Sequence, residues 1–549
     1  MDKVREWVPP SPRGERRIVF NSDPSTVATQ ILPDIVTEKH LSQMVDIFGD
    51  AGIDTLIQDC WNQGFTVYWR SDRLQYDQRP QHGRFLHMLD RGVQPLQVMR
   101  DRCRERGMSF LAGFRMNDTH DFPVYADFMQ NNPEFILEDR RKTLDIKLPP
   151  EASLDKGGKP LDYSHEPVRA FVYEAINCLL TEVEVDGVEL IFRDPGYFPV
   201  PQAADHHLHL MTDLIQTIRS RLDELGQERD QRLLLGVRVW STLSECRDIG
   251  LDVPKWIADG LIDYCAPMDS MFSDFNAEYE KFSELASGVE CRVYPGLHPW
   301  TSNRMRRRAV PMTNSMCRAL AHTFYAGGAD GVSVFNDFVG NMWSPPFYPQ
   351  SLHRFHELRD PERVCSGERH YVFDPPWAGV PWGGYGRNGV GVLKVPRTVL
   401  DRGKRDRSGI FRFVMYERMD RVSLATLLLT GEGLTEHDEL EVLLNGTLLP
   451  EGPLGNADWR TRERFTMPVI ATNDPPGLVT RSGPPRGKGT GNEDRQPRSL
   501  MDRRWFVLPK EAPLFGENTL TITLIDDGSK STGEVVIDEV EIWVQPKVA

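Results

Sequence analysis

Short stretches rich in β-branched and aromatic residues alternate with amphipathic stretches over residues 16–338 of this chain. The first kind has the length and composition of buried strands, and the second repeats apolar residues at the spacing of a helix face. Repeated strand–helix units predict an α/β domain with a parallel sheet. The strands are expected at residues 17–20, 53–59, 108–115, 185–192, 232–240, 261–268, 290–297 and 330–337, and the clearest helices at 38–52, 168–183, 208–225 and 312–328. Eight strands are the number that closes a (β/α)8 TIM barrel.

A different pattern begins at about residue 364, where apolar and polar residues alternate with a period of two. That period is typical of strands with one buried face, and Asn445-Gly446 is a hairpin-turn signal between two of them. An antiparallel β-sandwich, jelly-roll-like, is therefore expected after the barrel. The chain is predicted to divide into a catalytic barrel over residues 1–363 and an accessory β-sandwich over 364–549, with a flexible polar loop at about 473–499.

Composition excludes several classes of function. The formal net charge of -15 argues against a nucleic-acid partner, because binding a phosphate backbone requires a basic face. We find no apolar run long enough for a membrane span and no secretory leader, so a cytoplasmic location without membrane association is expected. The eight cysteines are scattered without zinc-site spacing, and Cys60, Cys265 and Cys291 fall inside expected strands as small buried hydrophobes.

Candidate chemistry lies where the expected barrel strands end, because the loops at the carboxyl ends of barrel strands build the active site. Arg193 and Asp194 stand out, since they end a buried run abruptly with opposite charges. Carboxylates and amides suit the hydroxyl groups of a sugar, and tryptophan faces suit its apolar side. The residues proposed to bind substrate are Asp59, Trp61, Arg115, Asn117, Asp118, His120, Arg193, Arg238, His298, Trp300, Asn336 and Asp337.

Glycosidic bonds are commonly hydrolysed by two carboxyl groups, one acting as general acid and the other as nucleophile or base. The preferred catalytic pair is Asp194 and Asp269, since each stands where an expected strand ends. Arg193 favours the ionised form of its neighbour Asp194, which suits a nucleophile or base and leaves Asp269 as the acid. The reverse assignment stays open, with Asp118 and Asp337 in reserve.

Several of these residues also have an ordinary structural interpretation. Asp59 could cap a helix, His298 could be a structural hydrogen-bond donor, and Trp61 and Trp300 could belong to the core. Arginines at the rim hint at an anionic sugar, although barrel arginines also brace neighbouring strand ends.

A divalent metal site is a further alternative at the end of the third expected strand. Asp118, His120 and Asp121 could serve a metal-assisted lyase or isomerase, although their spacing is unspecific. No cofactor is expected, because the motifs for phosphate cradling, dinucleotide binding and acyl transfer are missing from the sequence.

Several segments resemble a known group. The phrases LDYSHEPVRAFVYEAINCLLTEVEVDGVEL (161–190), RVYPGL (292–297), ADGVSVFNDF (329–338) and DELEVLLNGTLL (438–449) are similar to glycoside-hydrolase-like TIM barrels with a C-terminal β-sandwich. The resemblance covers most of the chain and implies a carbohydrate substrate, without naming the sugar. A homo-oligomer is possible.

The chain departs from that group at one position. The group carries an acidic residue two places after the glutamate that corresponds to Glu189, where this chain has Ile191, and its own acid comes later, as Asp194. Two functions are therefore carried forward: a glycoside hydrolase, and a barrel that binds carbohydrate without cleaving it.

Overall fold

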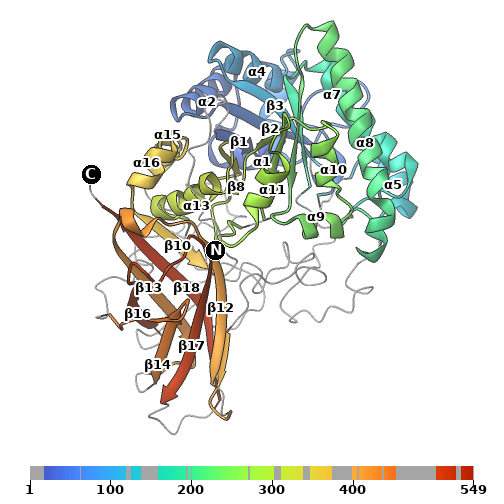
Figure 1. Cartoon of the computed structure of the whole chain (residues 1–549). Coiled ribbons are helices and arrows are strands. Elements are labelled where there is room, and N and C mark those ends of the chain that lie inside the picture. Colours follow the sequence, from blue (N-terminus) through green and yellow to red (C-terminus); the bar gives the residue numbers. More distant parts are fainter. Residues whose placement is uncertain are drawn as a thin grey trace.

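The structure is a computed structural model of the whole chain (Figure 1). It describes residues 18–61, 63–118, 125–137, 159–192, 196–199, 201–269, 272–301, 311–337, 347–373, 398–404, 407–435, 438–452, 503–526 and 533–547. The residues expected to form a polar loop at 473–499 lie outside these ranges.

A closed parallel barrel forms the first part of the chain. Its strands are β1 (Ile18–Ser22), β2 (Thr55–Trp61), β3 (Ser109–Arg115), β4 (Gly187–Ile191), β5 (Leu234–Val239), β6 (Tyr264–Pro267), β7 (Arg292–Val293), β8 (Gly296–Leu297) and β9 (Val332–Phe335). The sheet order is β7-β6-β5-β4-β3-β2-β1-β9-β8, with parallel pairing throughout. Since β7 and β8 are two halves of one strand, separated only by Tyr294 and Pro295, the sheet closes on itself. All eight expected strands and the TIM barrel are confirmed.

Helices surround the barrel (Figure 1). They are α1 (Pro24–Gln30), α2 (Glu38–Asp50), α3 (Leu86–Leu89), α4 (Pro95–Glu105), α5 (Asp127–Asn131), α7 (Glu166–Glu182), α8 (Pro201–Glu228), α9 (Leu243–Asp248), α10 (Val253–Ala258), α11 (Tyr279–Leu285), α13 (Asn314–Ala326), α15 (Phe355–Leu358) and α16 (Pro361–Ser366). The four helices expected from periodicity are α2, α7, α8 and α13. The apolar face of each helix packs against the sheet, because that face is the one shielded from solvent.

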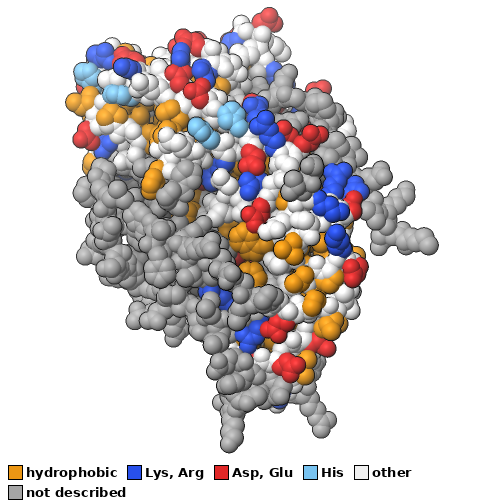
Figure 2. Space-filling model, turned by 90° about the vertical axis from the view of Figure 1, so that its left-hand side faces the viewer, with side chains coloured by type: hydrophobic (Ala, Val, Ile, Leu, Met, Phe, Trp, Pro, Cys, Tyr) orange, Lys and Arg blue, Asp and Glu red, His pale blue; other side chains and the backbone are white. Residues whose placement is uncertain are grey.

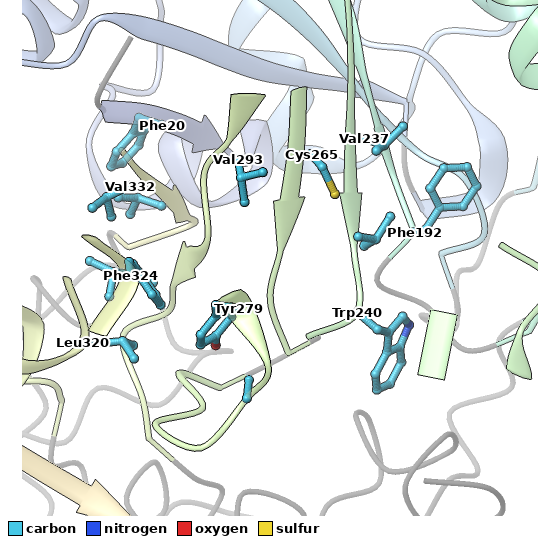
Figure 3. Close-up of a cluster of buried hydrophobic side chains, with 14 of the residues drawn as sticks. Phe20, Phe192, Val237, Trp240, Cys265, Tyr279, Val293, Leu320, Phe324 and Val332 are labelled. Atoms are coloured by element: carbon cyan, nitrogen blue, oxygen red, sulfur yellow. The ribbon is translucent and has the colours of Figure 1, made fainter. Parts of the chain in front are cut away.

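The outward faces of the barrel strands pack against these helices (Figure 3). Val237, Cys265 and Val293 come from three neighbouring strands and are fully buried. Tyr279 of α11 meets Phe324 of α13 edge-on, with ring centroids 4.7 Å apart. Cysteine inside a strand therefore behaves as the expected small hydrophobe; seven of the eight cysteines, all of which the structure describes, are buried.

An antiparallel β-sandwich follows the barrel, as expected. One sheet has the order β10 (Arg369–Phe373), β18 (Glu534–Pro546), β13 (Val422–Glu432), β16 (Arg503–Val507), with β11 (Thr398–Asp401) also on β18. The other has the order β12 (Ser408–Met415), β17 (Gly516–Asp526), β14 (Glu439–Leu444), β15 (Thr447–Leu448). Asn445 and Gly446 both have positive φ, so the hairpin turn lies where the sequence placed it.

The sandwich packs against the barrel on the side of α13 and α16 (Figure 1). His322 of α13 reaches the sandwich, with Nε2 3.0 Å from the carbonyl oxygen of Tyr416. One apolar core runs through both parts. On the face drawn in Figure 2, Lys and Arg side chains lie among Asp and Glu. Within the described ranges, no helix has both the length and the hydropathy of a membrane span.

Close packing inside the barrel makes Gly236 intolerant of a side chain. A Cβ at this position of β5 would lie 1.9 Å from Cζ of Tyr264, whose ring is buried in the barrel interior. Gly236→Ala is therefore expected to lower the free energy of unfolding by roughly 1–3 kcal/mol, measured by urea denaturation. Gly83→Ala is the matched control, since nothing lies within 4 Å of its added Cβ. Equal stabilities for the two variants would contradict the packing described.

Candidate active site at the mouth of the barrel

The barrel interior changes from apolar to polar along the strands. Towards the amino ends, the inward side chains form one buried cluster of Val19, Ile57, Leu111, Tyr264, Ala266 and Tyr294. Towards the carboxyl ends, the buried side chains are Asn21, Asp59, Arg115, Glu189 and Arg238. Barrel chemistry takes place at the carboxyl ends of strands, so the candidate site is this polar layer and the loops above it.

Arg115, the last residue of β3, binds three carboxylates. Its Nε donates to Asp59 Oδ2 at 2.8 Å, its Nη2 to Asp23 Oδ2 at 2.5 Å and its Nη1 to Asp118 Oδ2 at 3.2 Å. Asp23 also caps α1, accepting from the backbone N–H of Ser25 at 2.7 Å. One guanidinium thus ties together the carboxyl ends of β1, β2 and β3.

The shared cation leaves Asp59 and Asp23 with different proton affinities. Desolvation by burial and the negative charge of Asp23 together raise the pKa of Asp59 to about 6. The positive charge of Arg115 and the hydrogen bond that Asn21 donates act in the opposite direction and are outweighed. Burial also acts on Asp23, but Arg115 and the N–H of Thr26 outweigh it and lower its pKa. Of these two carboxylates, Asp59 therefore holds a proton more readily.

A second buried pair lies beside the first. Arg238 of β5 donates from Nε to Glu189 Oε1 at 2.9 Å, and Tyr264 donates from its hydroxyl to Glu189 Oε2 at 2.9 Å. Nη1 of Arg238 lies 3.1 Å from Ser333 Oγ. Because every buried charge needs a partner, this cluster fixes β4, β5, β6 and β9 against one another.

The two barrel arginines correct one expectation. Arg115 and Arg238 are each 1% exposed and lie over the ring of Phe335, with Cζ 5.4 and 5.5 Å from its centroid. Their charges are matched by carboxylates of the chain itself, so they brace strand ends and are not free to bind a substrate anion. Arg115 and Arg238 therefore give no support to an anionic sugar as substrate.

An apolar cluster occupies the place where the resemblance suggested an acid. Ile191, Met268 and Phe335 are buried together near the carboxyl ends of β4, β6 and β9. Ile191 is fully buried, so its side chain contributes packing to the barrel interior. No carboxylate can take part in chemistry from that position of β4.

Asp269 follows β6 and begins a loop that is held in place by the next strand end. Its Oδ1 accepts from the backbone N–H of Phe272 at 3.1 Å, and the residue is 1% exposed. Ser273 Oγ donates to the carbonyl oxygen of His298 at 2.8 Å, and Ser273 N–H donates to the carbonyl oxygen of Trp300 at 2.7 Å. The structure therefore brings together the loops that carry three of the expected site residues.

The two residues after β9 are also at the mouth. Asp337 is buried and forms an ion pair with Arg354, so a cation of the chain already neutralises it. Asn336 has a φ of 48°, a left-handed conformation that asparagine tolerates better than most residues. Both residues therefore lie at the carboxyl end of β9, where Arg354 holds the Asp337 carboxylate.

Asn117 has a structural role in the loop after β3. Its side-chain amide donates to the carbonyl oxygen of Leu161 at 2.9 Å, and its Oδ1 accepts from the N–H of Leu161 at 2.7 Å. Since the residue is fully buried, it holds the segment that leads to α7 and does not present its amide to a ligand.

Trp61 is a second correction, because it packs into the core and does not line the mouth. It is 2% exposed, and its ring lies 5.8 Å from Phe114 and 5.3 Å from Phe171 of α7. The cause is a β-bulge: Asp59 pairs with Gly113, but Trp61 pairs with Phe114, one residue further on. The bulge turns the tryptophan outwards.

Several expected residues lie outside the described ranges: His120, Asp121, Arg193 and Asp194. Asp194 therefore stays a sequence-based proposal. Among the residues that the structure describes, no group of three or more His, Cys, Asp or Glu is arranged to hold a metal. The suggested triad beginning at Asp118 includes His120 and Asp121, so this finding does not decide it.

Sequence reasoning missed three members of the polar layer. Asp23 stands directly after β1, three residues beyond the end of the first expected strand, and the rule applied to the other strand ends could have been extended to it. Asn21 and Glu189 lie within strands, where alternation with Val19 and Ile191 places them inside the barrel. A polar residue at an inward position of an otherwise apolar strand was the available signal.

Comparisons with known proteins return solved structures only; no family model and no curated protein matches the chain. An α-L-fucosidase isoenzyme from Paenibacillus thiaminolyticus has a TM-score of 0.39 at 12% identity, covering 65% of this chain and 51% of the fucosidase. A maltogenic α-amylase, AmyB from Thermotoga neapolitana, has a TM-score of 0.38 at 12% identity, covering 93% of this chain and 99% of the amylase. The α-galactosidase AgaB from Geobacillus stearothermophilus has a TM-score of 0.35 at 14% identity, covering 79% of this chain and 51% of the galactosidase.

These structures are all glycoside hydrolases by their names. The chain spans about half the length of the fucosidase and of the galactosidase. Similarity at such scores does not bear on which reaction this chain performs, so its function must be argued from its own site.

The raised pKa of Asp59 gives stability a specific dependence on pH. Between about pH 4 and 6 Asp59 keeps its proton in the folded state and loses it in the unfolded state, so its contribution to the free energy of unfolding falls as pH rises. Asp59→Asn cannot ionise, so the difference in unfolding free energy between wild type and variant should change across this range by on the order of 2–3 kcal/mol.

Urea denaturation at several pH values measures this difference. The variant is expected to be less stable overall, because one amide oxygen cannot replace both oxygens that accept from Asn21 and Arg115. Asp90→Asn, on the exposed surface, is the control and should leave the pH profile unchanged. A constant difference between wild type and Asp59→Asn from pH 4 to 6 would contradict the raised pKa.

Proposed function

We propose that this chain is a glycoside hydrolase that cleaves an oligosaccharide or a modified sugar at the carboxyl end of the barrel. The observation that carries the proposal is the position of Asp269: a buried carboxyl group at the carboxyl end of β6, on the same end of the barrel as the cluster around Arg115. Hydrolysis of a glycosidic bond commonly needs a carboxyl group that protonates the leaving group, and barrel chemistry takes place at the carboxyl ends of the strands.

In this proposal Asp269 protonates the leaving-group oxygen, and Asp194 acts as nucleophile or as the base that activates water. A sugar hydroxyl is proposed to bind Asp118, which Arg115 holds. A neutral sugar is favoured over an anionic one, because Arg115 and Arg238 already bind carboxylates.

A second candidate is a barrel that binds carbohydrate without cleaving it. The observation that favours it is the buried cluster of Ile191, Met268 and Phe335, which puts an apolar residue where the resemblance implies an acid. Both candidates place the sugar at the same mouth, so only turnover separates them.

The test is sugar release from a panel of neutral and anionic oligosaccharides, with and without a chelator. Asp269→Asn and Asp194→Asn are each expected to lower kcat by about 100- to 10,000-fold, since each removes a group that moves a proton or attacks the sugar. The control is Asp259→Asn, whose carboxylate is exposed and pairs only with Lys255 in the described surroundings.

An activated substrate assigns the two roles. The dinitrophenolate group of a dinitrophenyl glycoside departs as an anion and needs no proton from an acid. This substrate should therefore restore the rate of the first step in Asp269→Asn and leave Asp194→Asn inactive. Sugar binding without release by the wild type would support the second candidate. Turnover that survives both substitutions and stops only with the chelator would contradict the carboxylate mechanism.

A further inference from the structure

The loop that begins at Asp269 is attached to the barrel at its midpoint. Ser273 makes three hydrogen bonds to the segment after β8: from its N–H to Trp300, from its Oγ to the carbonyl oxygen of His298, and to its Oγ from the N–H of His298 at 2.8 Å. The N–H of Phe272, the residue before Ser273, donates to the Asp269 carboxylate at 3.1 Å. A displacement of Ser273 would therefore move Asp269.

Beyond Ser273 the same loop leaves the barrel and reaches the sandwich. The side-chain amide of Asn276 donates from Nδ2 to the carbonyl oxygen of Arg412 at 3.1 Å, and its Oδ1 accepts from the N–H of Val414 at 2.8 Å. Both partners are backbone groups of β12, which forms the edge of its sheet. One asparagine thus pairs with the edge strand as a neighbouring strand would.

The residue before Asn276 anchors the loop by packing. Phe275 is 2% exposed, and its ring centroid lies 6.4 Å from those of Tyr371 and Phe373 of β10, edge-on to both. Phe373 in turn packs against Phe413 of β12 at 4.9 Å. A barrel loop therefore contributes one side chain to the aromatic core of the sandwich and another to its edge.

We propose that Asn276 is a positioning residue, through which the edge strand β12 of the sandwich holds the loop that places Asp269 at the mouth of the barrel. The sandwich is then part of the catalytic unit and not only an accessory. This inference rests on the proposed function in one respect, namely that Asp269 acts as the general acid. An acid displaced by about 1 Å can lose much of its effect while the sugar still binds.

The test compares two asparagines that bind the backbone in the same way. In Asn276→Asp the acceptor for Val414 N–H remains, but the donor to Arg412 is lost and a carboxylate faces its carbonyl oxygen. Asn445 is the matched control, since it accepts from Thr519 N–H at 2.9 Å and donates to the carbonyl oxygen of Ala512 at 2.8 Å within the sandwich. Aspartate tolerates its positive φ.

Two readouts are needed. The first is amide hydrogen exchange of residues 272–276, which reports on the loop whether or not the chain turns over a sugar. The second is the separation of kcat from KM on the substrate that the wild type cleaves, with the pH profile of kcat. Val414→Pro removes the other hydrogen bond of Asn276, the one that the N–H of Val414 donates to Oδ1, and Pro is tolerated on an edge strand. It serves where Asn276→Asp does not fold.

We expect Asn276→Asp to speed exchange of the loop about tenfold, and to lower kcat about 10- to 100-fold with KM changed less than about threefold. The alkaline limb of the pH profile should shift, because the acid has left its site. Asn445→Asp should change none of these. Unchanged loop exchange, or faster exchange with an unchanged kcat, would overturn the proposal.

Failure of the proposed function would look different. A wild type that releases no sugar would remove the general-acid role of Asp269. Exchange would still decide the attachment: faster exchange in Asn276→Asp supports the role of β12 in holding the loop, and unchanged exchange overturns it.

Discussion

The carboxyl end of this barrel depends on the guanidinium of Arg115 and the three carboxylates that it binds. Asp59 lies within β2, Asp23 and Asp118 follow β1 and β3, and all three are nearly inaccessible to water. Without the cation, three buried negative charges would lie together at a cost of several kcal/mol each. The same cation leaves the pKa of Asp23 lowered, while burial raises that of Asp59.

A second consequence of burial concerns specificity. Arg238 and Glu189 form their own closed pair below the mouth, so both arginines are used to hold strands and neither supplies charge for a substrate. In the described part of the mouth Asp118 follows β3 and Asp269 follows β6, and both side chains are buried.

The sandwich and the barrel are joined by polar contacts as well as by apolar packing. His322 reaches the backbone at Tyr416, and Asn276 reaches the edge of β12. Both contacts use the backbone of the sandwich, whose geometry is fixed by its sheets. A loop tied to a rigid edge is better defined than one exposed on all sides, and that is what a site built from loops requires.

Much of the fold could be predicted from the sequence, because burial imposes periodicity. Each barrel strand is a short apolar run and each long helix has an apolar stripe, so β1 to β9 and α2, α7, α8 and α13 were found. β10 lacks such a signal, since its buried run includes Arg369 and His370, whose partners Glu417 and Glu541 are distant in sequence. Pairing at long range leaves no local signal.

The site was less predictable for the same physical reason. The ends of the expected strands identified Asp118, Asp269 and Asp337 as candidates. They could not show that Arg115 binds three carboxylates of the chain itself. Nor could it detect the bulge that turns Trp61 outwards, because the bulge is defined by pairing with β3. The direction in which a strand residue points depends on the pairing register, and that register is set by the neighbouring strand and not by the local sequence.

The most direct measurement is a crystal structure of Asp269→Asn with an oligosaccharide that the wild type cleaves. The account predicts a sugar at the carboxyl end of the barrel, with its glycosidic oxygen within hydrogen-bond distance of residue 269 and a hydroxyl group near Asp118. A sugar bound only to the sandwich, or at the mouth with its glycosidic oxygen remote from residue 269, would contradict it.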